Sequence, residues 1–159
     1  MANRVLVSVQ DGIPEPVWIG NVESFVLKVL NMLSFDGEEI SILFCDNVFI
    51  RELNKNYRDI DMPTDVLSFE NGEEYDDEDG SVWKEAGDIA ISVEMVSENA
   101  KYFDIDDNDE LKRLLVHGVL HLNGMDHGEE HIEPGKKPKC EMLVIQENLL
   151  EKIAAEKIM

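Results

Sequence analysis

The sequence predicts an α+β protein with a single domain, in which a small mixed β-sheet of about four strands packs against about five helices. Strand-like and helix-like segments follow one another irregularly, without the strict alternation of a parallel α/β fold. The chain has 159 residues, of which 43% are hydrophobic, so it can build one core of ordinary size. Because no internal repeat and no long linker divides it, we expect positions 1–159 to form one domain.

Four segments have the character of strands. Alternating apolar residues predict a strand at 4–10, and a β-branched apolar run predicts a buried strand at 39–45. Shorter strands are expected at 66–69 and 88–93, and these two can pair as a hairpin with a long connection. The stretch between them, 70–85, holds eight acidic residues against one lysine, which indicates a solvated acidic loop inserted into the domain.

Apolar residues at intervals of three and four predict five helices. We expect them at 17–33, 47–57, 94–103, about 109–122 and about 139–157. Asp46 is placed to cap the second helix, and Asp109 or Asn108 to cap the fourth. The fourth helix carries the most unusual side chains of the chain, and we expect it to be central.

All four histidines lie between positions 117 and 131. His117 and His121 are four residues apart, so they share one face of a helix. Gly124 can adopt the left-handed conformation that ends a helix, after which His127 can turn back towards the first pair. Three imidazoles from a helix and its exit turn suit a catalytic zinc ion with one position left for water. We therefore expect one Zn²⁺ on these three histidines, although the ligand set leaves other divalent metals open.

The alternative is a histidine cluster that binds no metal. The helix around the first pair is apolar, so two buried neutral imidazoles would need several polar partners, whereas one metal ion serves all three rings. The spacing also matches the long zinc motif of the metzincin proteases, except that Gly118 replaces the glutamate that acts as their general base. The motif thus keeps the metal site and lacks the protease base. A closely packed neighbour or an approaching substrate would account for this glycine.

Two further polar residues, His131 and Asp126, lie beside the histidine motif. His131 is expected to be an exposed loop residue rather than a ligand, because acidic residues and Pro134-Gly135 surround it. Asp126 is either an acceptor that orients an imidazole or an exposed turn residue.

A second dense group of polar residues spans positions 54–69. Within it, the planar guanidinium of Arg58 can bind a phosphate through two parallel hydrogen bonds. The alternative is an ion pair with Asp59, Asp61 or Asp65, an arrangement that is common in loops and contributes little energy. The residues alone slightly favour the ion pair.

The bulk composition limits partners and location. A net charge of −21 argues against broad electrostatic binding to a polyanion, but a small directed anion site beside the few clustered cations stays open. The two cysteines have no motif spacing, and we expect no disulfide and a core position for Cys45. No apolar run is long enough to span a membrane, and the chain opens with a strand pattern. We therefore expect no signal peptide and a cytoplasmic location.

Taken with these motifs, the chain resembles the YbeY family of metal-dependent, single-strand-specific endoribonucleases. The resemblance runs from about position 53 to the final helix, and three motifs carry it in order. They are Tyr57-Arg58 with Pro63-Thr64-Asp65-Val66-Leu67-Ser68-Phe69, then Gly87-Asp88-Ile89, and then the histidine motif. The family usually has a tyrosine where this chain has Met125, a position that supplies no metal ligand.

The resemblance implies that His117, His121 and His127 are zinc ligands and that Arg58 is the catalytic cation. It implies single-stranded RNA as the substrate, in 16S ribosomal RNA maturation and ribosome quality control. The small ribosomal subunit and its assembly factors are the implied partners, and positions 1–159 become one metal-dependent hydrolase domain. The residues themselves leave two alternatives: another zinc hydrolase, such as a peptidase whose base is Asp65 or Asp88, and a metal-stabilised interaction module without catalysis.

Overall fold

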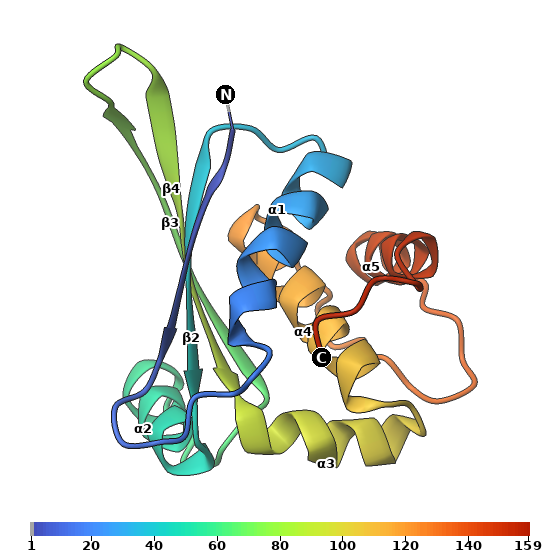
Figure 1. Ribbon diagram of the computed structural model, residues 1–159. Helices are drawn as coiled ribbons and strands as arrows, with labels where there is room; N and C mark the ends of the chain where they lie inside the picture. Colours follow the sequence, from blue (N-terminus) through green and yellow to red (C-terminus); the bar gives the residue numbers. More distant parts are fainter. Residues whose placement is uncertain (1) are drawn as a thin grey trace.

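A twisted four-stranded sheet lies against helices α1 and α4 in the computed structural model, which describes residues 2–159 (Figure 1). The strands are β1 (Arg4–Val9), β2 (Glu38–Cys45), β3 (Val66–Asp76) and β4 (Val82–Ser92). Their order in the sheet is β1-β2-β4-β3. The first three strands of that order run parallel, and β3 is antiparallel to β4, so the sheet is mixed. This confirms the predicted α+β class.

Five α-helices occur within the described part of the chain. They are α1 (Val22–Met32), α2 (Asn47–Arg58), α3 (Val93–Phe103), α4 (Asp107–Leu122) and α5 (Glu141–Lys152). Helix α4 lies between the sheet and α5, whereas α2 covers the opposite face of the sheet at one end (Figure 1). The central position predicted for the histidine-bearing helix is confirmed.

The main core fills the layer between the sheet and the helices α1 and α4. Alternate residues of β2 point into it, including Ile40, Ile42 and Phe44, each at most 1% exposed. They meet Leu30 of α1 and Leu115 of α4, which are also fully buried. Each large apolar side chain buried in this way contributes about 1.5–3 kcal/mol. The core therefore fixes α4, and with it the histidines, against the sheet.

A smaller core lies under α2 on the other face of the sheet. Cys45, Ile50, Leu67 and Ala90 form it. Burial and the neighbouring Asp46 carboxylate raise the pKa of the Cys45 thiol to about 12. The predicted core position of Cys45 is confirmed, and both Cys45 and Cys140 are free thiols.

Several helix ends differ from the sequence-based expectation. The Asp46 cap of α2 is confirmed, since its carboxylate accepts from Phe49 N at 2.8 Å. Helix α4, however, is capped by Asp106, whose carboxylate accepts from Asp109 N at 2.8 Å. Neither Asp109 nor Asn108 caps the helix; Asn108 Oδ1 instead accepts from Ile158 N at 2.7 Å.

The ends of α1 and α5 also differ. A short 3₁₀ turn, Ile19–Asn21, precedes α1, so this helix starts later than position 17. Helix α5 ends at Lys152 because a buried ammonium binds the chain that follows. Lys112 Nζ donates to the carbonyls of Ile153 and Glu156, both at 3.0 Å. These non-helical bonds satisfy the buried charge and divert the C-terminal segment.

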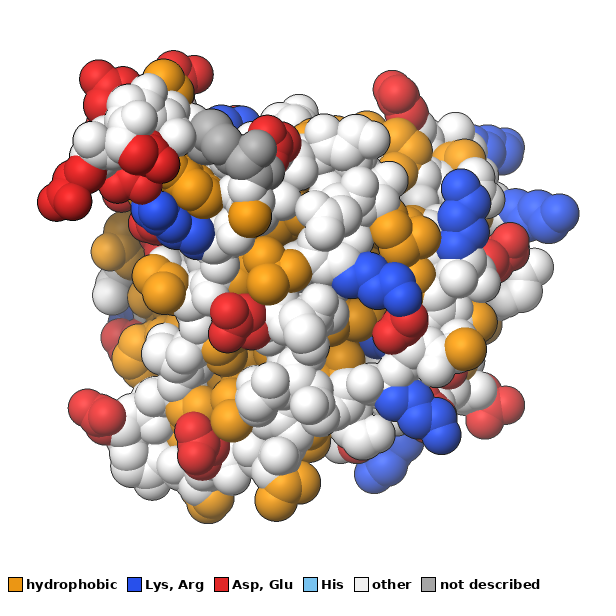
Figure 2. Space-filling model, turned by 45° about the horizontal axis from the view of Figure 1, so that its top comes forward, with side chains coloured by type: hydrophobic (Ala, Val, Ile, Leu, Met, Phe, Trp, Pro, Cys, Tyr) orange, Lys and Arg blue, Asp and Glu red, His pale blue; other side chains and the backbone are white. Residues whose placement is uncertain are grey.

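The predicted acidic loop at 70–85 is wrong, because β3 and β4 continue through most of it. Their register pairs Glu74 with Lys84 and Tyr75 with Trp83, and only residues 77–81 connect the strands. The hairpin projects past the rest of the sheet in Figure 1, and its acidic side chains gather at the upper left of Figure 2. Backbone pairing with β4 outweighs the low strand preference of acidic residues.

One cation of β1, the strand at the opposite edge of the sheet, binds the end of this hairpin. The Arg4 guanidinium donates to Asp77 Oδ2 at 2.7 Å and to the Tyr75 hydroxyl at 3.2 Å, and it lies 3.8 Å from the centre of the Trp83 ring. The acidic segment is therefore an ordered part of the sheet. Over residues 2–159, no helix has both the length and the apolar character needed to cross a membrane.

Candidate metal centre

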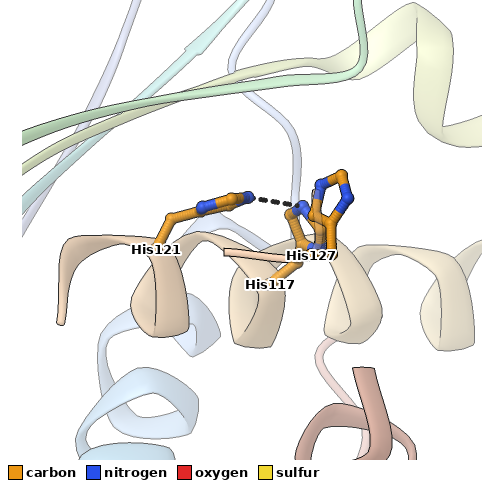
Figure 3. Close-up of side chains that lie close together, drawn as sticks. All are labelled: His117, His121 and His127. Carbon is orange, nitrogen blue, oxygen red and sulfur yellow. Dashed lines mark hydrogen bonds between the residues drawn. The ribbon is translucent and has the colours of Figure 1, made fainter. Parts of the chain in front are cut away.

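The three histidines of the motif converge on one point. His117 and His121 project from α4, and His127 comes from the segment that follows it (Figure 3). Gly124, with φ of +80°, lets the chain reverse after the helix, and Met125 N then donates back to Leu120 O at 3.1 Å. One nitrogen from each of the three rings lies within 4.8 Å of the others. This is a group that can hold a metal ion, as the spacing predicted.

Hydrogen bonds to the far sides of two rings fix their orientation. His117 Nδ1 donates to Gln146 Oε1 of α5 at 2.8 Å, and His121 Nδ1 donates to the backbone carbonyl of Met125 at 3.0 Å. Because carbonyl oxygens only accept, both Nδ1 atoms carry the proton and both Nε2 atoms present a lone pair. Such partners behind the ligands are what orients imidazoles at metal sites.

The bare triad leaves polar atoms unsatisfied in a way that a cation would relieve. The lone pairs of His117 Nε2 and His121 Nε2 face each other at 3.1 Å, and His127 Nδ1 is buried without a hydrogen-bond partner among residues 2–159. Burial, first of all, lowers the pKa of His117 to about 4 and also lowers that of His121, so neither ring protonates near neutral pH. A tetrahedral zinc ion with Zn–N bonds of about 2.0–2.1 Å holds two nitrogens about 3.3 Å apart. The residues therefore fit a metal.

Gly118 faces the sheet. A Cβ at this position would lie 2.8 Å from Cδ1 of Ile89, so the glycine allows α4 to approach β4 closely. Of the two explanations offered by the sequence, the close neighbour is the one observed. A side chain at position 118, the place of the glutamate base in metzincin proteases, would require Ile89 to shift.

A cavity of about 420 Å³ opens over the triad, and Arg58 lines it. This arginine is the last residue of α2, where a cation is favoured by the helix dipole, and its side chain is exposed. Among residues 2–159 it forms no ion pair: Asp61 pairs with Arg51 at 2.7 Å, and Asp65 accepts from Val66 N at 2.7 Å. The ion pair that the residues alone slightly favoured is thus absent from the described structure.

Other residues named from the sequence separate into those in the cavity and those outside it. His131 is exposed and lines the cavity, with its ring centre 5.3 Å from that of His127, but it lies outside the triad. The Asp126 carboxylate accepts from Gly128 N at 3.0 Å, so Asp126 is a turn residue. Of the two carboxylates considered as alternative bases, Asp65 lines the cavity and Asp88 does not.

Two contributors to the site escape the sequence-based reasoning. One is Gln146, which is 1% exposed and reaches His117 from another helix. The other is a buried network behind the cavity wall: Asn99 Nδ2 donates to Asp65 Oδ2 at 2.8 Å and to Glu110 Oε2 at 3.0 Å. Glu110 in turn binds Arg113, the second cation that lines the cavity. A polar residue within the apolar stripe of α5 was the one available signal for Gln146.

An α+β domain with three converging imidazoles, an open cavity and an unpaired arginine has the constitution of a metal-dependent hydrolase. Residues 11–154 match the sequence model of the family described as Endoribonuclease YbeY. The chain belongs to the YbeY family.

Individual relatives agree with this assignment. The chain is 52% identical to a Treponema denticola protein named Endoribonuclease YbeY, over 94% of this chain and 93% of that protein. It is 43% identical to the Borreliella afzelii protein of the same name, over 80% of this chain and 82% of the relative. Among solved structures, the solution structure of TM1509 from Thermotoga maritima superposes with a TM-score of 0.61 at 26% identity, covering 95% of this chain and 89% of that one.

Proposed function

We propose that this protein is a zinc-dependent endoribonuclease that cleaves single-stranded RNA. The observation that carries the proposal is the placement of the histidine triad and the unpaired Arg58 guanidinium in one cavity. Relatives that share most of the chain are named endoribonucleases, which supports RNA as the substrate class. His117, His121 and His127 are the proposed zinc ligands.

The chemistry follows from what each group can supply. Bound zinc provides a Lewis acid for a phosphate oxygen and makes water a stronger nucleophile near neutral pH. Arg58 binds the phosphate at the cavity and offsets the negative charge that grows on it during attack. Gln146 and the Met125 carbonyl keep the two helix-borne rings turned towards the cavity.

The absence of a base at position 118 favours phosphodiester over peptide cleavage. A metzincin-type peptidase needs a glutamate beside the first histidine, and this chain has a glycine there, packed closely against Ile89. Arg58, in contrast, offers the planar cation that phosphate recognition uses.

We further propose a role in 16S ribosomal RNA maturation and ribosome quality control, in the cytoplasm. This role rests on the family to which the chain belongs. With a net charge of −21, the protein repels RNA at long range. We therefore expect its substrate to be presented by the small ribosomal subunit or an assembly factor.

The test is a comparison of substrates at equal protein concentration. Zinc-loaded protein is incubated with a single-stranded RNA, with the same RNA annealed to its complement, and with an unfolded protein. The proposal predicts cleavage of the single strand, much slower cleavage of the duplex and an intact polypeptide. Proteolysis without RNA cleavage would contradict it.

A further inference from the structure

One wall of the cavity is aromatic. Tyr102 and Phe103 are the last residues of α3, and both line the cavity that contains the triad. Tyr102 is 67% exposed, and its ring packs edge to face on Phe103, with ring centres 4.9 Å apart and an angle of 82° between the planes. This contact restrains the tyrosine ring while most of its surface stays open to solvent.

Buried and half-buried residues of balanced charge hold this aromatic wall in place. The Arg113 guanidinium lies 3.7 Å from the centre of the Phe103 ring, and its Nε donates to Glu110 Oε1 at 2.8 Å. Glu110 is fully buried, and Asn99 Nδ2 donates to it at 3.0 Å. Phe103 is thus held from one side by a fixed cation, and Tyr102 rests on Phe103. The wall is organised before any ligand arrives.

The wall lies close to the metal centre along α4. Arg113, His117 and His121 follow one another at intervals of four residues, so they form one stripe, with about 6 Å of helix rise between successive members. An RNA strand whose phosphate lies at the triad and that follows this stripe towards Arg113 would bring a neighbouring base to Phe103 and Tyr102.

The overall charge favours a contact that does not depend on cations. Phosphate contacts with Lys and Arg supply the non-specific part of nucleic-acid affinity, but this chain carries a net charge of −21, and two arginines line its cavity. Stacking of a base on an aromatic ring is largely independent of net charge, and single-strand binding proteins use it widely.

We propose that Tyr102 is a stacking platform for one unpaired nucleobase next to the scissile phosphate, with Phe103 and Arg113 holding its ring in place. The inference rests on the proposed endoribonuclease function and names a substrate-binding contact for it. A base in a duplex is stacked and paired and cannot reach this ring, so the platform also accounts for single-strand specificity.

The chain offers a matched control in Tyr57. This tyrosine is 69% exposed and packs edge to face on Phe69, with ring centres 5.3 Å apart, much as Tyr102 packs on Phe103. It does not line the cavity. Loss of either ring removes a similar exposed aromatic surface, but only the loss of Tyr102 removes the proposed platform.

The experiment measures cleavage of a short single-stranded RNA by zinc-loaded protein. Tyr102→Ala is expected to raise KM about tenfold or more with kcat changed less than about threefold, as loss of a stacking contact requires. Tyr102→Phe, which keeps the ring, and Tyr57→Ala are both expected to retain the wild-type KM. A wild-type KM for Tyr102→Ala, or an equal rise in KM for Tyr57→Ala, would overturn the inference.

A second measurement separates stacking from a merely structural role. Oligonucleotides with a single abasic nucleotide at successive positions around the cleavage site are compared for wild type and Tyr102→Ala. One abasic position should raise the wild-type KM about tenfold and leave that of the variant unchanged. If the variant keeps the full abasic penalty, Tyr102 is not the platform. If the wild-type protein cleaves no RNA at all, the proposed function itself is wrong. If it cleaves RNA normally and the loss of Tyr102 has no effect, only the stacking platform is wrong.

Discussion

The histidine centre and the acidic hairpin are the two regions of strongest compositional bias, and their environments are opposite. The three histidines are partly buried, converge within 4.8 Å, and two of them are oriented by hydrogen bonds from behind. The acidic side chains of the hairpin spread along two paired strands and point mostly into solvent. The face that displays them shows no histidine (Figure 2).

Convergence and burial, rather than the density of one residue type, therefore mark a chemical site. Solvent and salt screen the exposed hairpin carboxylates from one another. Desolvation of the three closely spaced imidazoles costs free energy, and a ligand bound between them would offset this cost. Function should therefore respond steeply to changes at the histidines and weakly to changes on the hairpin.

The largest effect is expected for loss of a ligand. His121→Ala should abolish zinc binding and reduce RNA cleavage to background, because two imidazoles cannot hold the ion as three do. Elemental analysis and a cleavage assay check this on one preparation. His131→Ala is the control, since this exposed histidine lies next to the triad but outside it. Equal zinc loss in both variants would contradict the assignment.

The second-largest effect is expected for Arg58, on the exposed side of the cavity. Arg58→Ala should lower kcat about 10²–10³-fold, the usual cost of removing a group that stabilises transition-state charge, while zinc content stays at the wild-type level. Lys55→Ala, another exposed cation of α2, should have little effect. Cleavage by Arg58→Ala at the wild-type rate with equal zinc would remove Arg58 from the mechanism.

A smaller effect is expected for Gln146, which binds His117 on the side of the ring away from the other histidines. Gln146→Leu removes the acceptor for His117 Nδ1 and should weaken zinc affinity about 10–100-fold, as loss of such partners does at other metal sites. Gln146→Glu keeps an acceptor and should retain tight binding. Competition with a zinc chelator measures both, and unchanged affinity in the leucine variant would show that this bond does not tune the metal.

The smallest effect should come from the hairpin. Joint replacement of Asp76, Glu78 and Asp79 by their amides should leave zinc content and kcat within about twofold of wild type, because these side chains are exposed. Asp77 is kept, since it binds Arg4. With less repulsion, KM for RNA should fall modestly at low salt. Loss of zinc or of cleavage would show that the two regions are not independent.

The sequence was most informative where the structure is local. The four-residue interval of His117 and His121 and the helix-ending Gly124 are short-range patterns, and the structure reproduces both. The fold class followed in the same way from the periodicity of single segments. The N-cap of α4 could not be predicted in this way. Asp106, Asn108 and Asp109 are all suitable cap residues, and the packing of the C-terminus decides among them.

Long-range partners could not be predicted in this way. Gln146 reaches His117 across 29 positions, and nothing in the local pattern links the two. The prediction of an acidic loop at 70–85 was wrong for a related reason. Pairing with β4 and the Arg4 contact stabilise a strand that its own composition does not favour. Tyr75, Val82 and Trp83 are strand-forming residues inside the acidic stretch, and they were the available signal. Arg58 lines the cavity, and its catalytic role stays a prediction.

We propose that RNA cleavage depends on a zinc ion held by the three histidines. The most direct test strips the wild-type protein with a chelator, removes the chelator, and titrates zinc back while cleavage of a single-stranded RNA is followed. The stripped protein is expected to cleave no RNA, and cleavage is expected to recover and to saturate at one zinc per chain. Full cleavage by stripped protein that elemental analysis shows to be free of metal would contradict it.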